Sequence, residues 1–279
     1  IRGYTYDQNW VKNMTESSVS ANKCWSALVL AGNRPKGDAL AAQFGATAKA
    51  LIGFEGQPML SHVVAALRAT PQISHIVVIA QETAMLENAV ALGGGAMLLV
   101  SGAGISNSIK ALAGSRDLPF PILVTTADHP LLDPGTISNF LNGASDADVA
   151  IGMVEREVLT SRYPDNRRTW LKFSDGYWSG ANLFALQTAR CLPALELWAR
   201  AEQDRKTAWK LSLHFGPWLA VRALTRTIGL ADALAHAGKR LGLKAQLVAL
   251  DTPEAAIDVD KPEDYDLAVE IWQKRNSLN

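Results

Sequence analysis

The sequence predicts a three-layer α/β/α fold in which a mostly parallel central sheet carries helices on both faces. Two observations predict it. Short apolar runs recur in the first half of the chain, as expected for strands that are buried on both faces. Segments with helical periodicity separate these runs, and strand–helix alternation at this spacing indicates βαβ units. A long helical stretch around residue 200 further predicts a helical insertion before the last strand.

The first half of the chain supplies the core of the predicted sheet. Four apolar runs are read as strands: 24–32, 75–81, 96–102 and 121–128. Helical patterns lie between them at 58–70, 82–94 and 106–114, each ending near glycine or proline. In parallel sheets of this kind, ligands bind beyond the carboxyl ends of the strands. Those ends are here Gly32, Gln81, Ser101 and Asp128.

The second half of the chain follows a different pattern. Further strands are predicted at 147–155, 168–173, 180–186 and 244–250, with a loop at 162–168. Residues 189–242 read as nearly all helix, and 256–275 as a loop that leads into a closing helix. The simplest account is one domain over residues 24–279, with the helical insertion at about 189–242. Residues 1–23 are expected to form a flexible leader, of which 1–13 are candidates for a vector-derived tag because Met14 opens the natural-looking segment MTESS.

Composition narrows the class of protein. Lys and Arg together number 27 and so do Asp and Glu, which argues against a large nucleic-acid-binding face. The two cysteines, Cys24 and Cys191, lie outside any metal-ligand spacing and suggest buried thiols in a reducing compartment. No stretch approaches the ~20 apolar residues of a membrane helix, and the first 23 residues lack the apolar core of a signal peptide. We therefore expect a cytoplasmic protein without an integral membrane segment.

The loop after the first strand nearly spells a phosphate-binding motif. In GNRPKGDA, Gly32 and Gly37 have the separation of the two P-loop glycines, but Asp38 and Ala39 stand where lysine and a hydroxyl residue are required. The pattern G-x-G-x-x-G fails as well, because Asn33 and Arg34 follow Gly32. Backbone N–H groups at such a turn still suit an anion, and Arg34 and Lys36 add positive charge. On this stretch alone, an exposed basic loop remains an equal alternative.

Two acidic segments are candidates for a metal site. Asp128 ends an apolar strand at the ligand-binding rim, although an N-cap or turn role ahead of Pro130 is an alternative. Asp258 and Asp260 alternate in AIDVDKPED, so both side chains could share one side of an extended segment. Pro262 suits the start of the last helix, so Asp260 could instead be an N-cap residue.

Four segments together resemble the signature of the MobA-like nucleotidyltransferases, a branch of the Rossmann-like GT-A fold. They are ALVLAGNRPKGDALA…KALIGFEGQPML, VTTADHPLL, SGANLFAL and AIDVDKPEDYDLA, in the expected order over about residues 24–270. The resemblance implies the Rossmann-like nucleotidyltransferase fold. It also implies transfer of an NMP unit from an NTP, with CTP or GTP favoured, to a phosphorylated small-molecule acceptor, with release of pyrophosphate. Mg²⁺ or Mn²⁺ would be the cofactor.

The resemblance also assigns residues on the nucleotide side. The first loop would wrap the triphosphate, Arg34 would hold the β- and γ-phosphates, and Lys49 would lie beside the α-phosphate. The segment DALAAQFGATA separates Lys49 from the loop, so Lys36 is the alternative for that role. Asp128 would be the first metal ligand, Asp258 the second, and Asp260 the second choice. Lys49, Arg34 and Asp128 are the implied catalytic residues, and the implied nucleotide-binding set is Leu30, Ala31, Gly32, Asn33, Arg34, Lys49, Ser101, Gly102, Ser108 and Ala127. Ser106 or Ser108 could equally cap the helix that follows.

The acceptor side is less well defined. Gly180 and Asn182 match the acceptor loop of the family, and arginines such as Arg168 suit phosphate recognition. His129 and Lys206 complete the expected acceptor-binding set, although a solvated helix face is an alternative for the basic cluster around Lys206. Three other functions remain alternatives: guanylyl or cytidylyl transfer to a molybdenum cofactor, glycosyl transfer from an NDP-sugar, and nucleotide binding without catalysis. The oligomeric state is left open.

Overall fold

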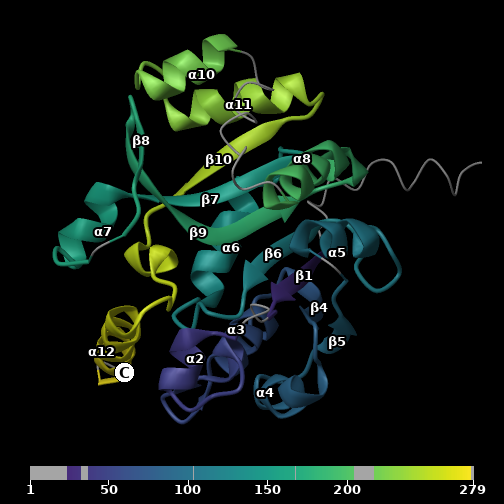
Figure 1. Ribbon diagram of the computed structural model, residues 1–279, viewed down its shortest axis with the longest axis vertical. Coiled ribbons are helices and arrows are strands. Elements are labelled where there is room, and N and C mark those ends of the chain that lie inside the picture. The colour runs from purple at the N-terminus through teal and green to yellow at the C-terminus, as the bar shows by residue number, and fades with distance from the viewer. Residues whose placement is uncertain (1–23, 33–36, 103, 167, 204–216, 278–279) are drawn as a thin grey trace, which may run out of the picture.

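A computed structural model describes residues 24–32, 37–102, 104–166, 168–203 and 217–277 (Figure 1). The strands are β1 (Trp25–Leu30), β2 (Gly53–Phe54), β3 (Gln57–Pro58), β4 (Ile73–Ala80), β5 (Met97–Val100), β6 (Ile122–Thr126), β7 (Val149–Glu155), β8 (Leu171–Phe173), β9 (Gly176–Leu186) and β10 (Ala245–Leu250). The helices are α2 (Ala39–Gln43), α3 (Met59–Arg68), α4 (Glu87–Leu92), α5 (Ile105–Leu112), α6 (Pro134–Gly143), α7 (Arg156–Arg162), α8 (Leu192–Gln203), α10 (Pro217–Leu224), α11 (Leu230–Arg240) and α12 (Pro262–Ser277).

One mixed sheet organises the molecule, with the strand order β10-β7-β9-β6-β1-β4-β5 and β8 paired to β9. The pairs β1–β4, β1–β6, β4–β5 and β7–β10 are parallel. Strand β9 runs antiparallel to both of its neighbours, β6 and β7. The predicted, mostly parallel sheet is therefore confirmed. β9 pairs with β7 and so does β10, so strands before and after the helical segment share one sheet.

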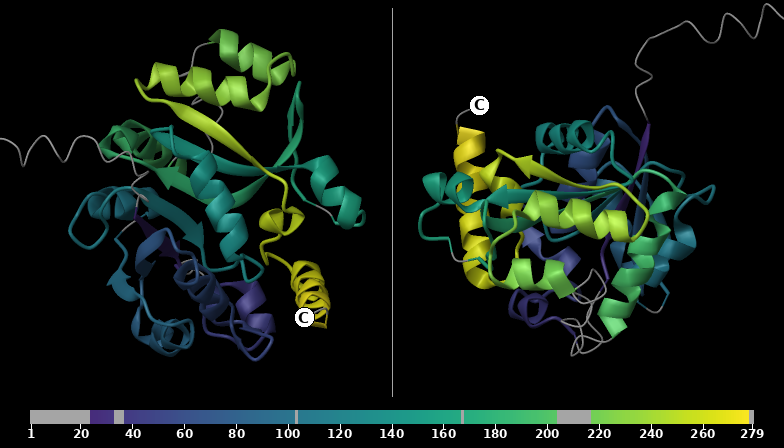
Figure 2. Two further views of the ribbon diagram at one scale, coloured as in Figure 1. Left: turned by 180° about the vertical axis from the view of Figure 1, so that it is seen from behind. Right: turned by 90° about the horizontal axis from the view of Figure 1, so that it is seen from above.

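Helices cover both faces of this sheet, as the view from above shows (Figure 2). The strand residues alternate between two apolar layers: Ala27 and Val29 of β1 face one, and Leu28 faces the other. The first layer holds residues from α3, α4, α6, α7 and α12, and the second holds residues from α5 and α8. A smaller cluster, formed by Met153, Trp178 and Leu230, lies under α11. This burial of apolar surface on both faces is the main source of stability in such a fold.

Several elements differ from the sequence-based expectation. Helices α6 and α7 were not predicted. Gly135, Asn139 and Asn142 weaken the helical signal in α6, but Asp133 caps it by accepting from Thr136 N at 3.0 Å, and Pro134 follows at the first position. Helix α7 has a polar sequence with one buried residue, Leu159. In the predicted helical stretch 189–242, the described part contains α8, α10 and α11.

Some expectations lie outside the described residues. These are the leader 1–23 and the site candidates Asn33, Arg34, Lys36 and Lys206. Within the described part of the chain, no helix combines the length and the hydropathy that a membrane span requires.

Candidate functional site

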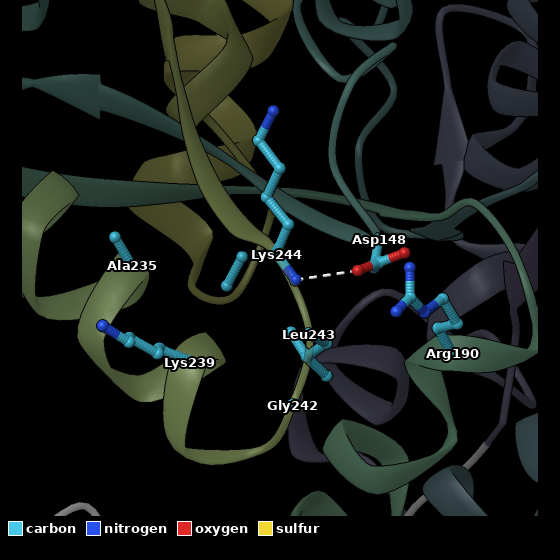
Figure 3. A pocket seen from close by; sticks show the side chains of 8 residues that line it. Asp148, Arg190, Ala235, Lys239, Gly242, Leu243 and Lys244 are labelled. Carbon is cyan, nitrogen blue, oxygen red and sulfur yellow. Dashed lines mark hydrogen bonds between the residues drawn. The ribbon is translucent and has the colours of Figure 1, made fainter.

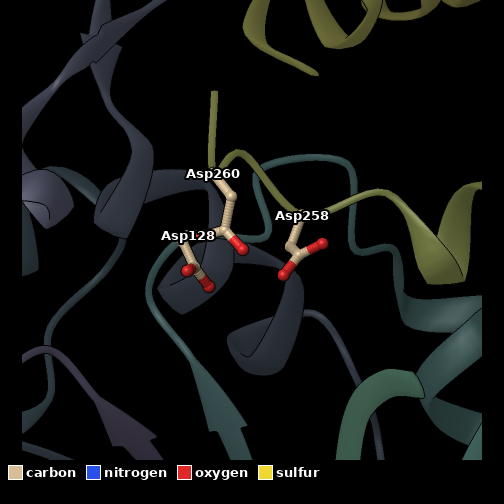
Figure 4. A group of neighbouring side chains, drawn as sticks. All are labelled: Asp128, Asp258 and Asp260. Carbon is tan, nitrogen blue, oxygen red and sulfur yellow. The ribbon is translucent and has the colours of Figure 1, made fainter. Parts of the chain in front are cut away.

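Two chain segments meet at the carboxyl end of β6. Asp128 lies two residues beyond the end of that strand, and the segment 257–260 passes beside it, because Val259 N donates to Asp128 O at 2.9 Å. This backbone contact brings three carboxylates together, and oxygens of Asp128, Asp258 and Asp260 all lie within 4.8 Å of one another (Figure 4). The alternative N-cap role of Asp128 is not observed, since Asp133 caps α6.

Lys49 supplies a cation to this carboxylate group. It opens the short 3₁₀ helix η1 (Lys49–Leu51), and its ammonium nitrogen lies 2.6 Å from Oδ2 of Asp128. The same nitrogen forms an ion pair with Asp260. Burial alone would lower the pKa of Lys49, but attraction and hydrogen bonds from Asp128 and Asp260 outweigh burial and raise that pKa. Lys49 is therefore held as a charged ammonium among the carboxylates.

Asp258 is oriented by two side chains, one from the loop before β8 and one from β9. Arg168 forms an ion pair with one of its oxygens, and Asn182 donates from Nδ2 to Oδ2 at 3.1 Å. Asn182 lies in a β-bulge: between the β7–β9 pairs Ile151–Phe184 and Met153–Gly180, β9 has more residues than β7. Its φ of 52° is the left-handed conformation that asparagine tolerates. The bulge thus turns the Asn182 amide toward Asp258.

The charges of this group suit a divalent cation. Three carboxylates face two cationic side chains, Lys49 and Arg168, so one negative charge is left over. Oδ1 of Asp128 is buried and has no hydrogen-bond partner within the part of the chain that the structure describes. A buried oxygen of this kind costs free energy unless it finds a partner. Hard oxygen donors at this spacing are the ligands that Mg²⁺ and Mn²⁺ prefer, so the residues present fit such an ion.

The expected nucleotide-side residues lie at the ends of neighbouring strands. Ala31 N donates to Ile79 O at 2.9 Å, and Ala127 N to Leu30 O at 3.1 Å, which places the start of the loop between β4 and β6. Gly32 is exposed, and a Cβ atom there would lie 3.1 Å from the amide of Gln81. A larger residue at position 32 would therefore crowd the strand ends.

Ser101, Gly102 and Ser108 follow β5. Ser101 N continues the strand pairing by donating to Ala80 O at 2.8 Å, and its hydroxyl is buried without a hydrogen-bond partner among the described residues. Ser108 lies inside α5, where its hydroxyl donates to Gly104 O at 2.8 Å. Gly104 is the N-cap residue of α5, so the alternative that Ser106 or Ser108 caps this helix is wrong.

The expected acceptor-side residues fall in different surroundings. Gly180 is exposed, and a Cβ atom there would have nothing within 4 Å. Arg168 and Asn182 contact Asp258, as described above. His129 is buried, with Nε2 3.1 Å from Glu254 O, so its side chain points away from solvent. Burial lowers the pKa of His129, which favours the neutral ring at neutral pH.

Sequence reasoning missed Glu254. This residue lies in the 3₁₀ helix η4 (Pro253–Ala256), which comes shortly before Asp258 in the chain. Its buried carboxylate accepts from Tyr163 Oη at 2.5 Å and pairs with Arg162 at 3.0 Å and with Arg275 at 3.5 Å. Burial would raise the pKa of Glu254, but the Tyr163 hydrogen bond and the two arginines lower it instead. Its surroundings in sequence, DTPEAA, gave no signal, because a glutamate after proline usually reads as a solvated helix start.

On the surface of the described residues, hollows also open away from the three carboxylates. One, of about 400 Å³, is lined by residues that include Asp148, Arg190, Lys239 and Lys244 (Figure 3). Asp148 lies at the amino end of β7, and β7 runs parallel to β6 because both are antiparallel to β9, so this hollow is at the edge of the sheet opposite Asp128. A second hollow, of about 770 Å³, lies between residues 162–166 and α12. Lys261 and Asp264 line it, so it borders the segment that carries Asp260.

Comparison with known proteins identifies relatives of this chain. A family model described as a MobA-like NTP transferase domain matches residues 27–214. A hypothetical transferase from Thermus thermophilus is 30% identical with a TM-score of 0.72, over 86% of this chain and 98% of its own. Two further solved structures share the fold. A 4-diphosphocytidyl-2C-methyl-D-erythritol synthase from Anaerococcus prevotii is 11% identical with a TM-score of 0.53, over 90% of this chain and 99% of its own. A CMP:2-keto-3-deoxy-manno-octonic acid synthetase complexed with CTP is 14% identical with a TM-score of 0.54, over 90% of this chain and 99% of its own. Among curated proteins, no match is found.

Proposed function

Because the chain belongs to the MobA-like NTP transferase family, we propose that it transfers an NMP unit from an NTP to a phosphorylated small-molecule acceptor and releases pyrophosphate. The observation that carries this proposal is the convergence of Lys49 with Asp128, Asp258 and Asp260 at the carboxyl end of the sheet. Ligand sites of open α/β sheets lie at that edge. CTP and GTP are the favoured nucleotides, and CTP is the first to test because one structural neighbour was solved with it.

Asp128, Asp258 and Asp260 would hold Mg²⁺ or Mn²⁺. The fit rests on the spacing of these three carboxylates, on their leftover negative charge and on Oδ1 of Asp128, which has no hydrogen-bond partner among the described residues. When bound, such an ion neutralises the charge of the triphosphate and of the departing pyrophosphate. Asn182 would keep Asp258 in orientation for this task, since it donates to Oδ2 of that residue.

Lys49 would exchange its carboxylate contacts for an α-phosphate oxygen. Its pKa is raised, so it carries the positive charge that this role needs. Its contact with Asp128, 2.6 Å away, holds the ammonium at the site before the nucleotide and the ion bind. The start of the first loop, Leu30 to Gly32, would lie along the triphosphate, and the exposed Gly32 would offer its backbone N–H, because that of Ala31 already donates to Ile79 O. Arg34 is proposed for the β- and γ-phosphates, although it lies outside the described residues.

The acceptor phosphate would attack the α-phosphorus in line. An oxygen of the acceptor forms a bond to that phosphorus, while the bond to the bridging oxygen of the β-phosphate breaks and its electron pair leaves with pyrophosphate. No catalytic base is required, because a phosphate monoester is already largely deprotonated near neutral pH. The open space above Gly180 supports an acceptor position there, and Arg168 would contribute positive charge beside it. The burial of His129 suits a supporting role better than acceptor contact.

The experiment is a pyrophosphate-release screen of four NTPs with Mg²⁺ against sugar, polyol, lipid-headgroup and molybdopterin-type cofactor phosphates. The proposal predicts release that requires both an NTP and one acceptor class. Release only with the molybdopterin acceptor would select molybdenum cofactor nucleotidyl transfer. Absence of release with every pair, together with NDP release from an NDP-sugar, would replace the proposal with glycosyl transfer.

A further inference from the structure

The segment that carries Asp258 and Asp260 has no regular structure of its own. Residues 257–259 belong to no helix or strand, and they run between η4 and α12. At the α12 end the segment is anchored by Asp264, whose Oδ2 accepts from Asp260 N at 3.2 Å and from Lys261 N at 3.1 Å. Besides the contacts of Asp258 with Arg168 and Asn182, the position of Asp258 therefore depends on what anchors the other end, at η4.

Glu254 provides that second anchor. We propose that Glu254 is a positioning residue, which fixes the Asp258–Asp260 segment against the loop that carries Asp128 and so sets the affinity of the carboxylate group for a divalent cation. This inference rests on the proposed function. Glu254 itself touches neither the three aspartates nor any position proposed for the nucleotide, so it would act only through the segment that it anchors.

The side chain of Glu254 ties η4 to two helices. Tyr163 Oη donates to Oε1 at 2.5 Å, and Arg162, at the end of α7, lies 3.0 Å from the same oxygen. Arg275, in the last turn of α12, lies 3.5 Å from Oε2. The side chain of Glu254 is 4% exposed, whereas that of Arg162 is 63% exposed. A buried carboxylate is tolerated only where its partners compensate for lost hydration, and these three partners do so here.

The backbone of Glu254 reaches the Asp128 loop. Its carbonyl oxygen accepts from Ile257 N at 3.0 Å and lies 3.1 Å from His129 Nε2, which adjoins Asp128. Arg275 extends the link, because its NH1 donates to Leu131 O at 3.1 Å. Val259 N, on the other side of Asp258, donates to Asp128 O. The segment that carries Asp258 is therefore joined to the Asp128 loop both before and after Asp258.

This arrangement bears on metal affinity because a preorganised site pays no ordering cost when the ion binds. Loss of the Glu254 charge leaves Arg162 and Arg275 without their carboxylate and loosens η4. The three aspartates then occupy a wider range of positions before the ion binds, and ordering them costs free energy. Partners that orient metal ligands in this indirect way typically change metal affinity by about 10- to 100-fold.

The test measures the affinity of the full chain for Mn²⁺ by electron paramagnetic resonance, without NTP or acceptor. The measurement is made at a temperature where circular dichroism shows the native fold. The isosteric variant Glu254→Gln should bind Mn²⁺ about 10- to 100-fold more weakly. Tyr163→Phe removes one hydrogen bond without altering charge and should weaken binding by a smaller factor. The matched control is Glu196→Gln, which breaks an exposed ion pair with Lys110 and should bind as the unaltered chain does. Pyrophosphate release by Glu254→Gln should recover as Mn²⁺ is raised, because the defect lies in metal affinity.

Unchanged Mn²⁺ affinity in Glu254→Gln, with only a lower melting temperature, would overturn the inference. Glu254 would then only stabilise the packing of η4 against α7 and α12. If Glu254→Gln does not fold, Tyr163→Phe decides in the same way. Failure of the proposed function gives a different result: the unaltered chain would then bind no Mn²⁺ at all, and the positioning role would fall with the metal site.

Discussion

The ammonium nitrogen of Lys49 lies 2.6 Å from Oδ2 of Asp128, although 79 positions separate the two residues in the chain. This contact places the ammonium group of Lys49, which follows the long first loop, at the carboxyl end of β6. It supports Lys49 as the residue beside the α-phosphate, whereas the alternative, Lys36, lies outside the described residues. The same contact means that Lys49 and a divalent cation would compete for the same carboxylates.

Replacing Lys49 by glutamine should therefore change two properties in opposite directions. Turnover should fall by about 10²- to 10³-fold, the usual effect of losing one group that stabilises transition-state charge. Affinity for Mn²⁺ without nucleotide should rise by about tenfold or more, because two unit charges 4 Å apart interact by about 4 kcal/mol at an effective dielectric of 20. Pyrophosphate release and Mn²⁺ paramagnetic resonance measure the two effects.

Lys110→Gln is the matched control for this variant, since it removes an exposed lysine that is paired with Glu196. Neither property should change in it. Weaker Mn²⁺ binding by Lys49→Gln would contradict the competition between Lys49 and the ion.

Asn182 allows the metal site to be perturbed without strain in the backbone. Asn182→Gly removes the hydrogen bond to Asp258 while glycine keeps the φ of 52° at no steric cost, so turnover should fall about tenfold with little loss of stability. Asn182→Ala should lose the same activity and about a further 1 kcal/mol of stability, because Cβ is unfavourable in that conformation. Urea unfolding and pyrophosphate release separate the two effects. Full activity in the glycine variant would rule out the role of Asn182 at Asp258.

Glu254 gives the stability of the fold a defined pH dependence. Its pKa in the folded chain is lower than the ordinary value of 4.5, so its contribution is complete above pH 4.5 and is lost as the pH falls through the folded-state pKa. The free energy of unfolding should exceed that of Glu254→Gln by about 3 kcal/mol at pH 7. That difference should shrink below pH 4.5. Denaturant titrations from pH 7 to pH 4 measure it, and a difference that grows toward acid pH would show that the charge of Glu254 destabilises the fold.

The sheet could be predicted from the sequence because its strands carry their own signal. The apolar runs that became β1, β4 and β6 are largely buried, and such runs are visible without any knowledge of their partners. The run that became β5 also carried this signal, but β5 lies at the edge of the sheet and its Met97 and Val100 are exposed, so the expected burial on both faces is wrong there. Helix α7 was missed because its stability comes from tertiary contacts: Leu159 packs in the core, while Arg162 and Tyr163 bind Glu254. Local propensity cannot report contacts with a residue about ninety positions away.

The candidate site was predictable only in part for the same reason. The place of Asp128 at the end of a buried strand follows from general rules for parallel sheets. The contacts of Arg168 and Asn182 with Asp258 depend on the bulge in β9 and on the irregular path of residues 257–260. Neither feature leaves a periodic pattern. The burial of His129 was likewise hidden, because a histidine beside a candidate ligand suggests function more readily than core packing.

In the proposed function, nucleotidyl transfer takes place at the carboxylate group around Asp128. The most direct measurement is the rate of pyrophosphate release by Asp128→Asn at saturating NTP, acceptor and Mg²⁺, beside the unaltered chain and Glu196→Gln. We predict at least a roughly hundredfold loss in Asp128→Asn, an unchanged circular dichroism spectrum, and normal rates in the control. A rate for Asp128→Asn within about twofold of the unaltered chain, far less than the loss of a metal ligand should cause, would contradict the account.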